Sequence, residues 1–232
     1  MTATVLTGVE ATAALARLTI KRALRGKAIW AAAVLALVPL LMPLLSKDSP
    51  AKVWSWLVGT YTVVLTIAAP ILVASSMSDE IDDRTAAYLW SRPLARWTII
   101  AGKIVGLTPV IALTVAVGLT LSWVILGAGA AVSVATLARG IGAFTAGAVG
   151  FATVSATIAT LAPRFAVPIA VCWLLLFDAT VGALDFGLHV VTVSFGTRAL
   201  ANGTDLVSGP VSLAVLTAIA AALAVWRIDR IE

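Results

Sequence analysis

The sequence is poor in charge and in metal-binding side chains. Its 232 residues include one cysteine, Cys172, and one histidine, His189. One cysteine permits no internal disulfide, and a single histidine without a cysteine pair excludes a typical zinc site. Charged residues make up 12% of the chain, about half of the roughly 25% found in ordinary globular proteins. So little polar material cannot cover the surface of a soluble globule.

Long apolar runs fill most of the sequence, and hydrophobic residues make up 61% of it. A helix that crosses a membrane needs roughly 20 apolar residues. Six stretches meet or nearly meet this length: 28–45, 53–77, 104–128, 140–162, 165–184 and 206–226. The alternation expected of barrel strands is missing. We therefore predict an all-α membrane protein with six transmembrane helices in a single transmembrane domain, residues 1–232. Small-residue pairs around Gly147 and Gly150 predict close helix packing in the fourth span.

Positive charge is unevenly divided between the two sides of the predicted bundle. Of the 16 Lys and Arg residues, only Lys47, Lys52, Arg139 and Arg198 fall on one side. Cytoplasmic loops carry the excess of positive charge, so we expect both termini in the cytoplasm. The alanine-rich composition suggests a bacterial cytoplasmic membrane. The charges cluster between apolar runs rather than along one face, which argues against a nucleic-acid partner.

Two segments outside the predicted spans are expected to contact the membrane. Arg17, Lys21 and Arg25 recur every four residues in 8–27, which predicts an interfacial helix on the inner leaflet. The alternative is a simple positive flank of the first span. The outer segment 185–205 mixes glycines with apolar pairs and is expected to re-enter the membrane. A surface loop is the alternative there.

The predicted inner segment 78–103 combines four acids at its start with an amphipathic stretch. Acids favour a helix N-terminus, and Pro93 must end or kink any helix that precedes it. This order of residues resembles the cytoplasmic loop of ABC type-2 exporter permeases. The matching residues are Glu80, Thr85, Leu89, Pro93, Arg96 and Lys103. Arg84 replaces the glycine that usually precedes the threonine.

The resemblance implies that this segment holds a coupling helix, which fits a cleft on a separate ATPase subunit. The residues expected to couple the two subunits are Glu80, Asp82, Asp83, Arg84, Thr85, Tyr88, Leu89, Trp90, Pro93 and Arg96. The charged edge of the contact would be formed by Asp82, Asp83 and Arg84, and its apolar surface by Tyr88, Leu89 and Trp90. The alternative is an ordinary amphipathic loop that lies on lipid.

No phosphate-binding loop is present in the sequence. Gly26-Lys27 and Gly102-Lys103 lack both the first glycine and the following Ser or Thr of the motif. ATP and Mg²⁺ would then be bound by a partner chain. The resemblance implies a non-catalytic permease subunit that holds no cofactor. It would work with two ABC ATPase subunits and a second permease subunit, identical or homologous, within membrane lipid. It would export a small amphipathic or lipid-like substrate.

Two other functions remain open from the sequence. One is a secondary transporter driven by a proton or ion gradient, for which broken helices and an intramembrane acid are typical. The other is a membrane-embedded enzyme that acts on lipids. The sequence offers that enzyme no nucleophile, base and metal ligands at a recognisable spacing.

Three ionisable residues near the fifth span form the candidate substrate path. Asp178, Asp185 and His189 would share one face of a continuous helix, with Gly182 leaving room for a ligand, a water or another helix. Asp178 is expected in the outer third of the bilayer. One hypothesis is that it faces an outer vestibule and interacts with the cargo. The alternative is that it pairs with Arg198 or caps a re-entrant helix.

Overall fold

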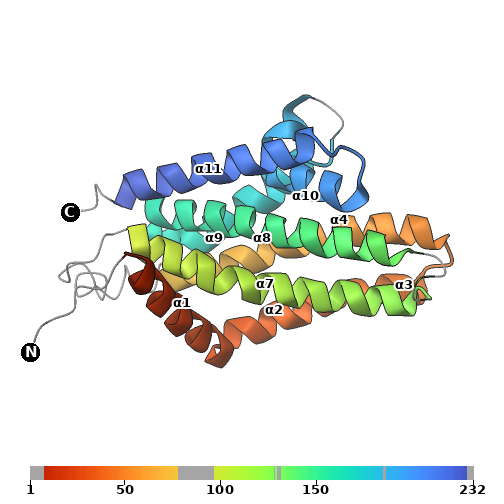
Figure 1. Ribbon diagram of the computed structural model, residues 1–232, viewed down its shortest axis with the longest axis horizontal. Coiled ribbons are helices and arrows are strands. Elements are labelled where there is room, and N and C mark those ends of the chain that lie inside the picture. Colours follow the sequence, from red (N-terminus) through yellow and green to blue (C-terminus); the bar gives the residue numbers. More distant parts are fainter. Residues whose placement is uncertain (1–7, 78–96, 128, 130–131, 185–186, 229–232) are drawn as a thin grey trace, which may run out of the picture.

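A computed structural model describes residues 8–77, 97–127, 129, 132–184 and 187–228. Within these residues every regular element is a helix, and no strand occurs (Figure 1). The helices are α1 (Gly8–Arg25), α2 (Lys27–Leu37), η1 (Val38–Leu40), α3 (Leu41–Leu45), α4 (Pro50–Ala69), η2 (Pro70–Ala74), α7 (Trp97–Ile125), α8 (Val134–Leu161), η3 (Pro163–Phe165), α9 (Ala166–Cys172), η4 (Trp173–Ala179), η5 (Gly187–Val191), α10 (Val193–Asn202) and α11 (Ser208–Ile228). The predicted all-α membrane protein is confirmed.

Four helices are long and apolar enough to cross a membrane, and they match four of the predicted spans. They are Pro50–Met77, Trp97–Ile125, Val134–Leu161 and Ser208–Arg227. The segments 8–25 and 29–45 pass the same test together, although the chain bends by 68° between them. The structure therefore contains four such spans, or five with the bent pair.

The fifth predicted span, 165–184, is shorter in the structure than in the prediction. Its helix covers 166–181 and ends before Gly182, which lies in a turn. Sixteen residues of α-helix extend about 24 Å, less than the roughly 30 Å of membrane hydrocarbon. The total of six transmembrane helices therefore stays a prediction.

Prolines lie at two of the irregular parts of the helices, η1 and η2. Pro70 follows α4 and opens η2, a π-helical turn. Pro39 lies in η1, the 3₁₀ turn that separates α2 from α3. A proline has no N–H to donate and its ring clashes with the preceding turn, so the helical hydrogen-bond pattern changes there. Pro109, in contrast, is accommodated inside α7.

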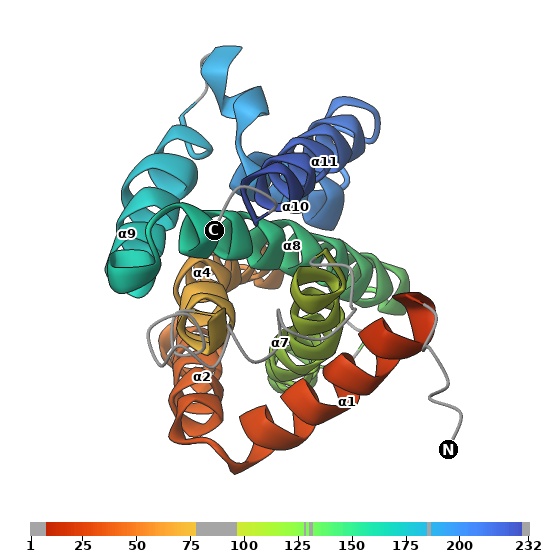
Figure 2. The same ribbon diagram turned by 90° about the vertical axis from the view of Figure 1, so that its left-hand side faces the viewer.

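Helix α8 forms the centre of the bundle. In the end-on view, α4 and α7 lie on one side of α8, and α9, α10 and α11 lie on the other (Figure 2). Its buried side chains are mainly small, with Phe144 and Phe151 as the two large ones. Phe144 meets the ring of Tyr61 from α4 edge-on, with 6.2 Å between ring centroids. Small residues let the neighbouring helices approach α8 closely.

The first helix, α1, crosses the beginning of α7 (Figure 2). Gly102 and Gly106 of α7 form the contact. A methyl group on Gly106 would lie 2.8 Å from the carbonyl oxygen of Ala16, and one on Gly102 would lie 2.7 Å from Cβ of Leu15. No larger residue fits either position without moving α1.

We predict that Gly106→Ala destabilises the protein, because the added methyl group pushes the α1 backbone away from α7. Overpacking of this kind typically costs about 1–3 kcal/mol. Gly142→Ala is the matched control, since Gly142 lies in α8 with nothing within 4 Å of an added methyl group. Thermal unfolding in detergent should show a lower midpoint for Gly106→Ala and an unchanged or higher one for Gly142→Ala. Equal midpoints for the two variants would contradict the close contact.

Candidate functional site

The predicted ATPase-coupling residues lie outside the described part of the chain. This applies to all ten: Glu80, Asp82, Asp83, Arg84, Thr85, Tyr88, Leu89, Trp90, Pro93 and Arg96. The structure does place the helices on either side of them, which end at Met77 and begin at Trp97. Both of these points lie at the end of the bundle where α11 also finishes (Figure 1).

Lys103 links the two helices that flank the predicted coupling segment. It lies in the second turn of α7 and is only 4% exposed. Its Nζ donates a hydrogen bond to the backbone carbonyl oxygen of Ser76, near the end of the second span. A lysine at the C-terminal end of a helix satisfies a carbonyl group that has no partner within the helix. Lys103 thus holds the second and third spans together at this end.

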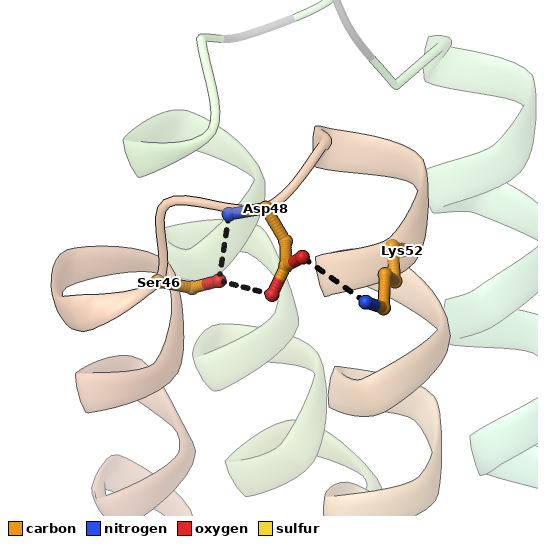
Figure 3. Close-up of polar contacts among 3 residues, drawn as sticks. All are labelled: Ser46, Asp48 and Lys52. Carbon is orange, nitrogen blue, oxygen red and sulfur yellow. Dashed lines mark hydrogen bonds and ion pairs between the residues drawn. The ribbon is translucent and has the colours of Figure 1, made fainter.

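The turn at the opposite end of the bundle has its own polar contacts, drawn in Figure 3. The backbone N–H of Asp48 donates to Oγ of Ser46 over 3.2 Å. The Asp48 carboxylate forms an ion pair with Nζ of Lys52 at 3.0 Å. Both partners are well exposed, and exposed pairs of this kind contribute little to stability. This turn therefore provides a useful control site.

The carboxylate of Asp178 accepts three hydrogen bonds inside the bundle. It lies in η4, is 5% exposed, and directs its carboxylate at the beginning of α10. Oδ1 accepts the backbone N–H of Val193 at 2.7 Å, and Oδ2 accepts that of Ser194 at 3.0 Å. The Ser194 hydroxyl also donates to Oδ2. Both carboxylate oxygens are therefore occupied by donors from α10.

These contacts complete the N-terminal cap of α10. The first N–H groups of a helix have no partner within it, and a negative charge there is stabilised by the helix dipole. Asp178 satisfies the first two, and Oγ1 of Thr192 accepts the third, from Phe195, at 3.2 Å. Thr192 is the N-cap residue and is fully buried. The arrangement corresponds to the capping alternative that the sequence left open. A contact between Asp178 and the cargo stays a prediction, which would require these hydrogen bonds to open.

The α10 helix begins deep in the bundle. Methyl groups on Gly150 and Gly147 of α8 would lie 2.9 Å from Val193 and 2.5 Å from Thr197, respectively. These glycines are near the middle of the 28-residue helix α8. Asp178 is bonded to Val193, so it lies at the same level. The predicted close packing at Gly147 and Gly150 is confirmed, and the position of Asp178 in the outer third of the bilayer stays a prediction.

His189, another residue of the predicted substrate path, does not share a continuous helix face with Asp178. The helix ends at Val181, and a methyl group on Gly182 would lie 2.5 Å from Oγ1 of Thr192. The space at Gly182 is thus filled by the chain leading into α10. His189 lies in η5, half-buried, with its ring 4.3 Å from that of Phe195. Asp185 lies outside the described residues. The prediction of a continuous helix from Asp178 to His189 is wrong, because the helix ends before Gly182.

Arg198 lies beside the capped end of α10 and was named from the sequence only as an alternative partner of Asp178. Its Nε donates to the carbonyl oxygen of Ser194 over 3.3 Å. Its second terminal nitrogen is buried without a hydrogen-bond partner among the described residues. That nitrogen lies 3.0 Å from where a methyl group on Gly182 would be. Ser194 and Thr192 were missed by the sequence reasoning, because backbone capping depends on an approach between segments that spacing alone does not reveal.

A second carboxylate, outside the spans, caps the last helix. Asp205 accepts hydrogen bonds from the hydroxyl of Ser208 and, over 3.0 Å, from its backbone N–H. These two donations hold the pKa of Asp205 below its usual value. No group of three His, Cys, Asp or Glu residues is placed to bind a metal ion within the described residues. The geometry thus assigns these carboxylates to helix capping.

Comparison with known families adds a decisive observation. A family model described as ABC-2 family transporter protein matches residues 21–179, which is more than half of the chain. The chain belongs to the ABC-2 transporter family. The resemblance noted at the predicted inner segment is thereby confirmed, and the chain is the membrane domain of an ABC transporter, a family that implies an ATPase partner. A comparison with curated proteins found no match.

We predict that Asp178→Asn lowers the stability of this ABC-2 membrane domain. The amide keeps one acceptor and puts an NH₂ group against the N–H donors of α10. A buried donor left without an acceptor costs about 1–3 kcal/mol. Asp205→Asn is the control, because Asp205 makes the same type of cap in a half-exposed turn. Thermal unfolding should show the larger drop for Asp178→Asn. A stable Asp178→Asn variant with altered transport would instead favour a contact with cargo.

Proposed function

We propose that this chain is the permease subunit of an ABC exporter, which moves a small amphipathic or lipid-like substrate outward. The observation that carries the proposal is the family match over residues 21–179, joined to the loop pattern from Glu80 to Lys103. In this proposal the chain itself is not an enzyme. ATP and Mg²⁺ bind to the partner, and two ATPase subunits act on a pair of permease subunits, identical or homologous.

The inner segment is proposed to transmit movement from the ATPase to the bundle. The contact between Lys103 and Ser76 supports this role, because it joins the two helices that the segment connects. A displacement of the segment would therefore be passed to both spans as one unit. Helix α7 would in turn carry α1 with it through the contacts at Gly102 and Gly106.

The proposed cargo and orientation are argued from the turns and the charges at the two ends of the bundle. The turn 46–49, which links α3 to α4 at the end of the bundle away from Met77 and Trp97, is short. Such a surface favours a small or membrane-soluble cargo over a bulky polar one. We propose a bacterial cytoplasmic membrane with both termini in the cytoplasm, as the positive-inside rule predicts. A gradient-driven transporter is the alternative function, and an ATPase requirement separates the two.

Replacing Arg84 and Tyr88 together by alanine should uncouple the ATPase or release it, since both are proposed to contact the ATPase. We expect the permease to fold normally while ATP-driven transport and co-purification of the ATPase fall several-fold. Asp48→Ala with Lys52→Ala is the matched control, a pair at the opposite end of the bundle (Figure 3). Normal transport and ATPase association in the Arg84 and Tyr88 variant would remove this segment from the mechanism.

A further inference from the structure

A row of positive charge lies on the exposed side of α1. Arg17, Lys21 and Arg25 are all exposed. Four residues advance an α-helix by slightly more than one turn, so these three side chains follow one another along the same side. We call these three residues the cationic stripe. Arg22 lies to one side of it, and Glu10 is separated from Arg17 by about two turns of helix.

Exposed leucines border the cationic stripe on both sides. Leu18 is 64% exposed and Leu24 is 58% exposed. At about 100° per residue, Leu24 falls next to Arg17 on one side and Leu18 falls next to Arg25 on the other. Long cationic side chains can extend to a charged group while leucines beside them contact apolar material. This combination of charge and apolar surface is typical of a helix in a membrane interface.

The direction of the cationic stripe is fixed by the contact between α1 and α7. The side of α1 away from the stripe meets α7 through Thr12, Leu15 and Ala16, which lie against Gly102 and Gly106. The backbone of Ala16 is held against Gly106, where a methyl group would come within 2.8 Å of its carbonyl oxygen. The helix cannot rotate about its axis without losing this contact. The stripe therefore faces outward from the bundle.

Two tryptophans mark the ends of α1. Trp97 packs on Gly8, with its ring 3.1 Å from where a methyl group on Gly8 would be, and is 42% exposed. Trp30, just beyond the other end of α1, is 72% exposed. Exposed tryptophans gather at the headgroup level of membranes. The positions of Trp97 and Trp30 therefore place α1 at the headgroup level.

The length of α7 supports the position of α1 at the headgroup level of the membrane. Its 29 residues extend about 43 Å, roughly 13 Å more than the hydrocarbon core. The contacts of α1 reach from Trp97 to Gly106, which is about 14 Å of the helix. The first turns of α7 can therefore pass through the headgroup layer, with α1 beside them.

We propose that the cationic stripe of α1 binds the phosphate groups of anionic phospholipids, while Leu18 and Leu24 contact their acyl chains. The exposed face of α2 continues the apolar surface from α1 through Trp30 and Val34, which are 72% and 63% exposed. This continuity favours lipid over an acidic protein as the occupant. Anionic lipid would hold α1, and through Gly106 the beginning of α7, at a fixed depth in the inner leaflet.

The test compares Lys21→Gln/Arg25→Gln with wild type, using brominated phosphatidylglycerol as the probe in phosphatidylcholine bilayers. Quenching of tryptophan fluorescence gives the association constant of the anionic lipid relative to phosphatidylcholine. Each cation near an anionic surface contributes about 1 kcal/mol, so the double variant should bind phosphatidylglycerol about 10- to 30-fold more weakly. The wild-type preference should also decrease as salt is raised.

The matched control is Lys47→Gln/Lys52→Gln, which removes two charges at the opposite end of the bundle. This control should keep the wild-type preference for phosphatidylglycerol. A preference retained in Lys21→Gln/Arg25→Gln, or lost equally in the control, would overturn the proposal. Loss of ATPase co-purification from Lys21→Gln/Arg25→Gln with its lipid preference intact would also overturn it, because the stripe would then meet the ATPase.

Discussion

The close approach of α10 to α8 is the constraint on which the arrangement of α9, α10 and α11 depends. Gly147 and Gly150 leave room for Thr197 and Val193, and Gly196 of α10 approaches the backbone of Gly209 in α11. Without a strong hydrophobic force between helices in lipid, association relies on van der Waals packing and hydrogen bonds. These glycines allow a ten-residue helix to insert between longer ones. Such a helix begins where no water can satisfy its free N–H groups.

That position explains the polar chemistry inside an otherwise apolar bundle. A buried carboxylate is costly unless it is hydrogen-bonded, and the N-terminus of a buried helix is costly unless it is capped. The Asp178 carboxylate gains its hydrogen bonds from the N-terminus of α10, and that N-terminus gains its cap from Asp178. The contact also joins the fifth predicted span to α10. At the other end, Lys103 joins the second and third spans by donating to Ser76. Each contact links two segments that lie far apart in the sequence.

The long spans could be predicted from the sequence because apolar length is a local property. The resemblance at Glu80 to Lys103 also predicted the family correctly, since its residues lie within one short segment. The site around Asp178 could not be predicted from the sequence in the same way. Its spacing to His189 suggested one helix face, whereas the chain turns at Gly182 and brings backbone donors of α10 to the carboxylate. Contacts between segments, such as Ala16 with Gly106, leave no periodic signal in either segment alone.

The central claim is that this ABC-2 membrane domain works in a complex whose motor lies in other chains. Native mass spectrometry of the complex, purified gently from its own membrane, measures that composition directly. We expect a mass equal to two permease subunits and two ATPase subunits, with ATP hydrolysis present in the complex and absent from the isolated chain. A particle that transports substrate down an ion gradient, with no ATPase subunit in its mass, would contradict the account.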